Sequence, residues 1–425
     1  MSKLTLGVMT LYLNANKQLE ERAYFRKLIA QGKRLGITVV VFTPQDVDYS
    51  YDRVQAQLYD PDNKVWVRRW MPLPQVIYDR CRYQPNERFR QFQKFRARYA
   101  DRLVFLNRPI GNKWSIHQLL SRNTAVRPYM PATSVYHSAQ DLVQFIRGRN
   151  LVYMKPINGT GGRGIVRIEK VSSGTYLIQG RDSHRRIITP RTASERQIPQ
   201  KLTGFNIRDR YLIQQGIQSK LSDGRVHDFR LLIQKNGSGQ WEVTGCAGRV
   251  GPKRSITSNL HGGGEAVPML TLLRLNFSND KTDQIVKEIH RLSHSVAEQL
   301  ERTYGKLCEL GLDIAIDPSG HPWLLELNPK PAREVFIRIG ERDTYAKAIS
   351  RPLEYALWVH AGGNRSRKAG SGSGDKSKPL GGAERSGKPA STSERERAEE
   401  AVAGSGGSNG SGVANGYGSA GGSGS

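Results

Sequence analysis

The chain has 425 residues and a formal net charge of +27 at pH 7, with 65 Lys and Arg against 38 Asp and Glu. This length allows two or three domains with a sizeable core, and no apolar run approaches the length of a membrane-spanning helix. Three isolated cysteines, Cys81, Cys246 and Cys308, fit neither a disulfide framework nor a zinc site, so we expect a reducing, cytoplasmic location.

The first elements in the chain alternate between strand and helix. The stretch LTLGVMTLYL lacks the basic leader and small-residue cleavage site of an export signal, and we expect it to be a strand. Gly36 is expected to end the following helix, and Pro44 the second strand. The expected elements cover residues 4–13, 19–35, 37–42, 74–79 and 87–102. Their order predicts a small α/β domain with parallel strands over residues 1–108.

The last of these elements, residues 87–102, is strongly basic. Phe92, Phe95 and Tyr99 follow helical spacing, which predicts an amphipathic helix with a basic outer face. The basic residues are Arg88, Arg90, Lys94, Arg96, Arg98 and Arg102. Each of them is explained by an ordinary solvated surface, whereas the total charge favours an anionic partner such as a nucleotide or an acidic polymer.

Residues 109–360 form the next predicted unit, which contains few parallel-strand signals. Asn112 and Ser138 are the expected caps of two short helices, residues 112–120 and 138–148. Further strands are expected at 133–136, 151–156, 164–171, 175–180, 211–217, 229–235 and 241–250, followed by a helix at 281–304 and a hairpin of 312–316 with 323–327. This pattern predicts an α+β unit with antiparallel sheets.

The segment from Ala361 to Ser425 is built of Gly, Ser, Ala, Lys, Arg and Glu, and Tyr417 is its only aromatic residue. Such a composition cannot bury enough apolar surface to offset chain entropy, so it predicts a disordered tail.

A glycine-rich loop is the strongest local signal. Within LVYMKPINGTGGRGIVRIEKV, four glycines crowd one loop: Gly159, Gly161, Gly162 and Gly164. A P-loop would end in Gly-Lys-Ser/Thr and a dinucleotide fingerprint would be followed by a helix, and neither is present here. A flap that covers a nucleotide between two antiparallel strands fits best, because glycine lets backbone amides approach phosphate oxygens. An ordinary hairpin is the alternative.

Lys155 ends the strand that enters this loop. There its ammonium could meet a phosphate as a point charge, which favours the nucleotide flap over the plain hairpin. The alternative for this residue is a surface lysine at a strand end.

The segment GLDIAIDPSGHPWLLELNPKP is the second signal. Asp317-Pro-Ser-Gly is typical of a turn, and a hairpin centred there places Asp313 opposite Glu326. Glu326 and Asn328 are two residues apart on a strand and therefore point to one face. Oxygen ligands of this kind suit Mg²⁺ held jointly with phosphates. A charged outer face is the alternative, but carboxylates among Leu, Ile and Ala neighbours need a cation nearby.

Taken together, these segments resemble the ATP-grasp superfamily, and more closely the YheC/YheD-type ATP-grasp proteins associated with endospore coats. The resemblance covers residues 1–360 and is carried by the ordered set NKWSIHQLL, MKPINGTGGRGI, YLIQQGI, HDFRLLI, GRVGPKRSITSNLHGGGEA and LLELNPKP. It implies an N-terminal α/β domain like those that precede ATP-grasp folds, and then two α+β subdomains that clasp ATP.

The resemblance also implies roles for individual residues. The implied ATP-binding residues are Lys113, Lys155, Gly159, Gly161, Gly162, Gly164, Gln214, Gln215 and Ile217. The implied magnesium ligands, for two ions, are Asp313, Glu326 and Asn328. The implied catalytic residues are Arg230, Arg249 and Asn259, with Asp228 beside Arg230 and Gly262 to Gly264 beside the substrate. A structural ion pair is the alternative for each arginine, and a turn is the alternative for Asn259.

The chain departs from the family pattern at three places. Gln215 stands where many relatives carry a glutamate, and no acidic residue follows the hinge to hold the ribose hydroxyls. Gly311 stands where some peptide-forming relatives carry an arginine. These departures bear on nucleotide affinity and acceptor chemistry more than on the fold.

The resemblance implies an ATP- and Mg²⁺-dependent ligase that joins a small-molecule or peptide carboxylate to an amine through an acyl phosphate, and a link to endospore coat formation. Its second implication is a catalytically weak or inactive ATP-binding protein that serves a structural role in the coat. A nucleic-acid-binding function rests on charge alone and ranks last, because no recognition module is present.

Overall fold

The computed structural model describes residues 3–83, 86–159, 161–184, 186–205, 207, 210–253, 255–258 and 260–363. The predicted disordered tail lies outside the described residues from position 364 onward, and Asn259 also lies outside them. All described residues belong to one compact unit, so the predicted division near residue 108 stays a prediction.

The N-terminal sheet has the strand order β3-β4-β2-β1-β6-β7, with β5 paired to β4. Its strands are β1 (Thr5–Met9), β2 (Thr38–Phe42), β3 (Val47–Asp48), β4 (Arg53–Asp60), β5 (Val65–Pro72), β6 (Val76–Asp79) and β7 (Val104–Leu106). As predicted, β1 runs parallel to β2 and β6. β6 also runs parallel to β7, a strand that was not expected from the sequence. These central strands are buried on both faces, which explains their continuous apolar sequences.

Helix α1 (Arg22–Arg34) buries Phe25, Leu28 and Ile29, whose spacing places them on one helical face. Helix α2 (Glu87–Arg98) likewise buries its aromatic residues, as predicted. Arg96 is the exception to the basic outer face, because its guanidinium lies 2.9 Å from the buried carboxylate of Asp79.

The hairpin of β4 and β5 has no counterpart among the sequence expectations. β5 is exposed along most of its length, and Val65 and Trp70 are half exposed to solvent. Because neither face of β5 is buried, its sequence lacks the alternation of apolar and polar residues that identifies a strand.

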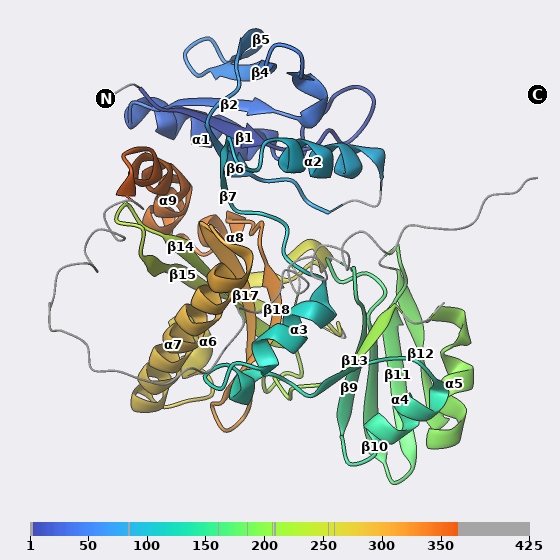
Figure 1. Ribbon diagram of the computed structural model, residues 1–425. Coiled ribbons are helices and arrows are strands. Elements are labelled where there is room, and N and C mark those ends of the chain that lie inside the picture. The colour runs from blue at the N-terminus through green and yellow to red at the C-terminus, as the bar shows by residue number, and fades with distance from the viewer. Residues whose placement is uncertain are drawn as a thin grey trace, which may run out of the picture. The chain divides into compact units, whose positions relative to one another are not determined.

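The second sheet is antiparallel and has the order β12-β11-β10-β9-β13-β8. Its strands are β8 (Thr133–Val135), β9 (Leu151–Pro156), β10 (Val166–Ser172), β11 (Thr175–Arg181), β12 (Ile187–Ser194) and β13 (Tyr211–Gln215). Helices α4 (Ala139–Ile146) and α5 (Ile198–Lys201) cover one of its faces (Figure 1). Helix α3 (Lys113–Ser121) precedes the sheet and is capped by Asn112, as predicted.

The third sheet is also antiparallel, with the order β16-β15-β14-β17-β18. Its strands are β14 (His227–Lys235), β15 (Trp241–Val250), β16 (Glu265–Pro268), β17 (Glu309–Ile316) and β18 (Pro322–Asn328). The remaining helices are α6 (Met269–Arg274), α7 (Asn279–Tyr304), α8 (Glu334–Arg338) and α9 (Arg342–His360). Leu231 and Ile233 of β14 pack in the core with α7, whereas Leu232 packs with α8 and α9 on the other face.

The predicted strands of residues 109–360 are therefore confirmed, and both sheets are antiparallel as expected. The strand β12 and the helix α9 were not anticipated. α9 contains Pro352, which is an unusual residue inside a helix and conceals the helical pattern. None of the helices in the described part of the chain is long and apolar enough to cross a membrane.

A fully buried ion-pair network joins the N-terminal sheet to the third sheet. The carboxylate of Glu309, at the start of β17, accepts from Arg80 at 2.6 Å and from Arg333. Nearby, Lys330 of the LLELNPKP motif lies 3.0 Å from a carboxylate oxygen of Asp79. Part of this motif therefore serves to hold the sheets together.

Candidate functional site

A cavity of about 120 Å³ is lined by residues of the second and third sheets and of the segment after β13. The predicted site residues that line it are Lys113, Lys155, Gly159, Gly161, Gly162, Gln214, Gln215, Ile217, Asp313 and Glu326. The predicted residues Gly164, Asn328, Arg230 and Arg249 do not line it. The structure therefore brings both predicted signals, the glycine loop and the carboxylate hairpin, to one place.

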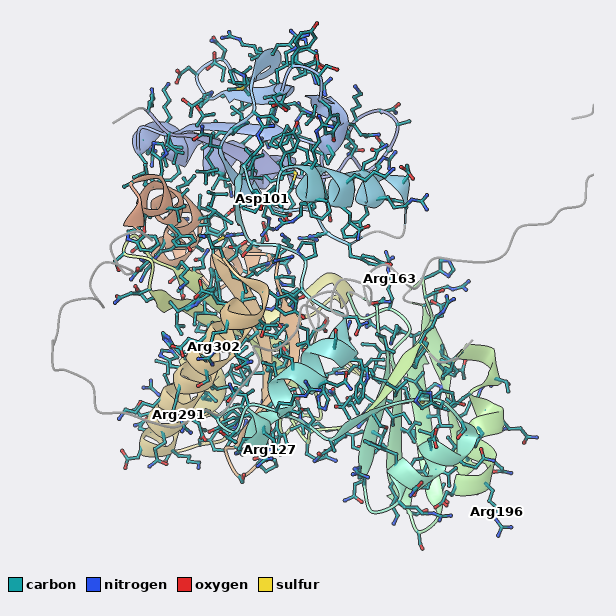
Figure 2. The ribbon with its side chains drawn as sticks, viewed as in Figure 1. Asp101, Arg127, Arg163, Arg196, Arg291 and Arg302 are labelled. Atoms are coloured by element: carbon teal, nitrogen blue, oxygen red, sulfur yellow. The ribbon has the colours of Figure 1, made fainter. Side chains whose placement is uncertain are left out.

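The glycine loop joins β9 to β10, which pair in antiparallel register, so it is followed by a strand as predicted. Gly161, Gly162 and Gly164 have φ values of 66°, 75° and 65°, a region that favours glycine. A Cβ atom on Gly164 would lie 2.7 Å from the hydroxyl of Tyr211, so this glycine also permits close packing. Arg163, between these glycines, is exposed at the cavity (Figure 2).

Lys155 points into the cavity because alternate residues of β9 face opposite sides of the sheet. Val152 and Met154 pack in the core beneath α4, and Tyr153 and Lys155 face the cavity. The Lys155 ammonium donates a 2.6 Å hydrogen bond to Gln214 Oε1. Burial lowers the pKa of Lys155, and the carboxylates of the cavity oppose this effect. Lys155 is therefore not a surface lysine at a strand end.

Gln214 is itself fixed by a second hydrogen bond, because its Nε2 donates to Thr133 Oγ1 at 3.1 Å. This contact leaves Oε1 free to accept from Lys155. The amide thus orients the ammonium and adds no negative charge to the cavity.

Lys113 lies at the first turn of α3 and links the glycine loop to the carboxylate hairpin. Its ammonium donates to the carbonyl oxygen of Gly159 and lies 3.4 Å from Glu326 Oε1. A ligand with several anionic oxygens would meet Lys113 and Lys155 in the same cavity.

The carboxylate hairpin has the predicted register, with Asp313 of β17 paired to Glu326 of β18. Asn328 pairs with Gly311, and its Nδ2 atom is buried without a hydrogen-bond partner. A ligand oxygen would satisfy this orphaned atom. A Cβ atom on Gly311 would lie 2.9 Å from Pro331, so the absence of an arginine there has a steric reason.

The oxygen donors present fit Mg²⁺ in chemistry and in number. In the described parts of the chain, no three or more His, Cys, Asp or Glu side chains gather into a metal cluster. Asp313 and Glu326 supply two carboxylates, so an ion here would take its remaining ligands from water and from a bound polyphosphate. This is the arrangement that Mg²⁺ favours over a cage made only of protein atoms.

The two predicted catalytic arginines form ion pairs behind the cavity. Arg249 lies 2.8 and 2.6 Å from the two oxygens of Asp228, and its Nη2 is 3.1 Å from Asp313. Arg230 holds Asp313 in a two-point contact at 2.5 and 3.0 Å. The structure thus shows the ion-pair alternative, and the catalytic role of either arginine stays a prediction.

These arginines determine the charge state of Asp313. Burial alone would raise the pKa of this carboxyl, but the guanidinium groups of Arg230 and Arg249 outweigh burial and lower it to about 2. Asp313 is therefore an anion throughout the neutral range, as a magnesium ligand must be.

Among the lining residues that sequence reasoning missed are Tyr153, Arg167 and His227. Arg167 donates to Gln179 Oε1 at 2.8 Å and lies 2.6 Å from the carboxylate of Glu169. Two of them could have been found from the alternation of side chains along β9 and β10. Tyr153 shares a face of the sheet with Lys155, and it pairs directly with Arg167.

The chain lacks an acidic residue directly after the hinge, but the structure places one nearby. Lys220 lies 2.9 Å from Glu169, which belongs to β10. This carboxylate does not line the cavity itself, but it contacts two residues that do, Lys220 and Arg167. Among the predicted substrate residues, Gly262 to Gly264 are described, and Asn259 is outside the described residues.

The chain is similar to known proteins over most of its length. A sequence profile of the family described as YheC/D like ATP-grasp matches residues 102–359. The Bacillus subtilis (strain 168) protein called endospore coat-associated protein YheC is 28% identical over 344 residues, which cover 79% of this chain and 91% of that protein. Endospore coat-associated protein YheD of the same organism is 26% identical over 342 residues, covering 79% of this chain and 74% of that protein.

Solved structures of similar fold include the D-Ala:D-Ser ligase VanG from Enterococcus faecalis, with a TM-score of 0.49, 8% identity, and coverage of 84% of this chain and 100% of that chain. Another is D-cycloserine synthetase DcsG, with a TM-score of 0.48, 14% identity, and coverage of 82% and 99%. The profile match extends over more than half of the chain and includes both the glycine loop and the carboxylate hairpin. The chain belongs to the YheC/D-like ATP-grasp family.

Proposed function

We propose that the protein is an ATP- and Mg²⁺-dependent ligase that joins a carboxylate to an amine and releases ADP and phosphate. One observation carries this proposal: Lys155, Asp313 and Glu326 line a single cavity closed on one side by the glycine loop. Two lysines for a polyphosphate and two carboxylates for a divalent cation form a complete set for phosphoryl transfer.

The reaction has two balanced steps. A carboxylate oxygen of the substrate attacks the γ-phosphorus of ATP, ADP leaves, and an acyl phosphate forms. The amine nitrogen then attacks the acyl carbon and loses a proton, and phosphate leaves. Neither step needs a covalent bond to the protein, so positioning and charge stabilisation are the contributions asked of the chain.

The described residues suit these contributions. Lys155 and Lys113 bind and orient the phosphates, and the backbone amides of the glycine loop exclude water from them. Asp313, Glu326 and Asn328 would hold Mg²⁺, for which two ions are expected. When bound, this metal neutralises the charge that develops on phosphoryl oxygens.

Arg230 and Arg249 position Asp313 through the ion pairs described above. We propose that they also add positive charge near the transferred phosphoryl group, because both contact the carboxylate of Asp313, which lines the cavity. Asn259 is proposed to contact the substrate.

The two curated relatives are both called endospore coat-associated. We therefore propose that the product of this ligase, or the protein itself, contributes to the spore coat, with synthesis in the cytoplasm. Small-molecule or peptide carboxylates and amines are the proposed substrates.

The second candidate is an ATP-binding structural protein of the coat. The names of the relatives favour it, and so does the engagement of Arg230 and Arg249 in ion pairs. A structural protein would bind nucleotide without consuming it.

A screen for ADP production separates the two candidates. Purified full-length protein with Mg²⁺ and ATP is incubated with mixtures of acidic amino acids, peptides and amines, and ADP is measured by a coupled assay. Turnover that requires both a carboxylate and an amine supports the ligase. Nucleotide-dependent thermal stabilisation without turnover over a broad panel supports the structural protein.

A further inference from the structure

The cavity-facing side of the second sheet continues past the cavity to Arg181. On β11, Tyr176 and Ile178 pack in the core with α4 and α5, and a Cβ atom on Gly180 would lie 2.7 Å from Phe205 on that same side. The alternate residue Arg181 therefore projects toward the opposite side, where Lys155 and Arg167 also lie.

Arg181 reaches the loop between β15 and β16. Arg181 is 7% exposed to solvent, and its Nη2 donates a hydrogen bond to Ser255 Oγ at 3.3 Å. A Cβ atom on Gly262 would lie 2.5 Å from Arg181 Nη1. Glycine at position 262 therefore leaves the space that the guanidinium occupies.

Arg181 differs from the other deeply buried arginines in the described part of the chain. Each of the others has a carboxylate within 4 Å: Arg80 and Arg333 contact Glu309, Arg167 contacts Glu169, and Arg249 contacts Asp228. Among the described residues, the side-chain partner of Arg181 is the neutral hydroxyl of Ser255.

A buried guanidinium without a counter-ion is costly, and a hydroxyl offsets only part of that cost. A planar guanidinium also matches a carboxylate in a two-point contact. Ser255 directly precedes Ile256, Thr257 and Ser258, which line the cavity. The uncompensated charge of Arg181 therefore lies beside the proposed reaction site.

We propose that Arg181 and Ser255 form a carboxylate-binding subsite for the substrate, separate from the phosphate-binding residues. This inference rests on the proposed function and narrows its substrate class. The substrate carries a second, non-reacting carboxylate, as in a dicarboxylic acid, an acidic amino acid or a peptide that ends in one. Arg181 binds that group and directs the other carboxylate toward the nucleotide.

Glutarate is the probe, because it carries two carboxylates and no amine. Full-length protein is saturated with Mg²⁺ and ADP to occupy the phosphate-binding residues, and glutarate is titrated by calorimetry. We expect Arg181→Gln to weaken glutarate binding about tenfold or more, as the loss of a charged hydrogen bond implies. We expect butyrate, which lacks the second carboxylate, to bind wild type as weakly as glutarate binds Arg181→Gln.

Two further variants separate binding from folding. Gly262→Ala places a methyl group against the flexible end of Arg181, so it should weaken glutarate binding while the thermal midpoint changes little. Arg196→Gln is the matched control, since Arg196 is an exposed arginine near α5 (Figure 2) and should leave glutarate binding unchanged.

The stability of Arg181→Gln is the sharpest readout. Because no described residue supplies a counter-ion to Arg181, removal of its charge should leave the thermal midpoint unchanged or raise it, whereas removal of a structural arginine would lower it. The proposal is overturned if glutarate does not bind wild type, or if it binds Arg181→Gln equally well. It is also overturned if this variant loses ADP and glutarate binding together, since Arg181 would then hold the loops in place. If the wild-type protein binds glutarate but does not bind ADP, the proposed function is overturned and the carboxylate-binding subsite is not.

Discussion

Lys155 donates a 2.6 Å hydrogen bond to Gln214, so the ammonium that enters the cavity is held by a neutral amide. Among the described residues, no carboxylate lies within 4 Å of the Lys155 ammonium. Its positive charge is therefore available to bind an anionic ligand, and the first prediction tests this.

Lys155→Met should abolish the thermal stabilisation that Mg²⁺ and ATP confer and weaken ATP binding by about tenfold to a hundredfold, because a charged contact to phosphate is lost. The nucleotide-free protein should unfold at nearly the wild-type temperature. Differential scanning fluorimetry and calorimetry measure both effects. Lys287→Met, which changes an exposed lysine of α7, is the control. Full nucleotide stabilisation in Lys155→Met would contradict the proposed site.

Glu326→Ala should abolish the magnesium-dependent part of nucleotide binding. Glu326 pairs with Asp313 across β17 and β18, and it lies 3.4 Å from Lys113, so its removal takes away one of the two carboxylates that are proposed to hold the metal. ADP titrated with and without Mg²⁺ gives the measurement. We expect the wild-type difference between the two titrations to vanish in the variant. An unchanged difference would show that the metal is held elsewhere.

Asp313→Asn should lower the free energy of unfolding at neutral pH and make that free energy depend less on pH in the acidic range. Burial raises the pKa of Asp313, but the two arginines lower it more strongly. The pKa therefore moves from 3.8 to about 2 on folding. A carboxyl of this kind contributes stability that is complete above its unfolded pKa and is lost as the pH falls toward its folded pKa. The free energy of unfolding of wild type, measured with urea, should therefore fall between about pH 4 and pH 2. The variant lacks this contribution at every pH and should not show the fall.

Asp101→Asn is the control for that series, because Asp101 is exposed (Figure 2). It should follow the wild-type curve. If Asp313→Asn and wild type show parallel curves over the acidic range, the ion pairs of Asp313 do not contribute to stability.

Glu309→Gln should lower the free energy of unfolding by about 3 kcal/mol, because Arg333 would remain buried beside a neutral group and Arg80 would keep only its ion pair with Glu21. Urea unfolding at pH 7 measures this change. Glu87→Gln, which removes an exposed contact to Arg90 on α2, should have little effect. Equal stability of both variants would contradict the role of Glu309 in joining the sheets.

The sequence was sufficient for the elements that have a regular pattern or a local cap. Asn112 and Ser138 identified the starts of α3 and α4, because a side-chain cap is a contact within four residues. The opposed positions of Asp313 and Glu326 followed from the turn at Asp317, since a hairpin sets its own register.

Elements without such a pattern could not be predicted. β5 is exposed on both faces, and α9 contains a proline, so neither shows the periodicity that a sequence reader depends on. The buried contact of Glu309 with Arg80 joins residues 229 positions apart, and no local pattern predicts it.

The amino-acid sequence by itself determined the family, the antiparallel second and third sheets, and ten of the residues that line the cavity, because motif order and strand alternation are local properties of a chain. Only the tertiary structure decided the electrostatic state of those residues. Whether Arg249 faces a carboxylate and Arg181 a hydroxyl depends on how separate strands and loops pack, and the cost of a buried charge depends on that packing alone.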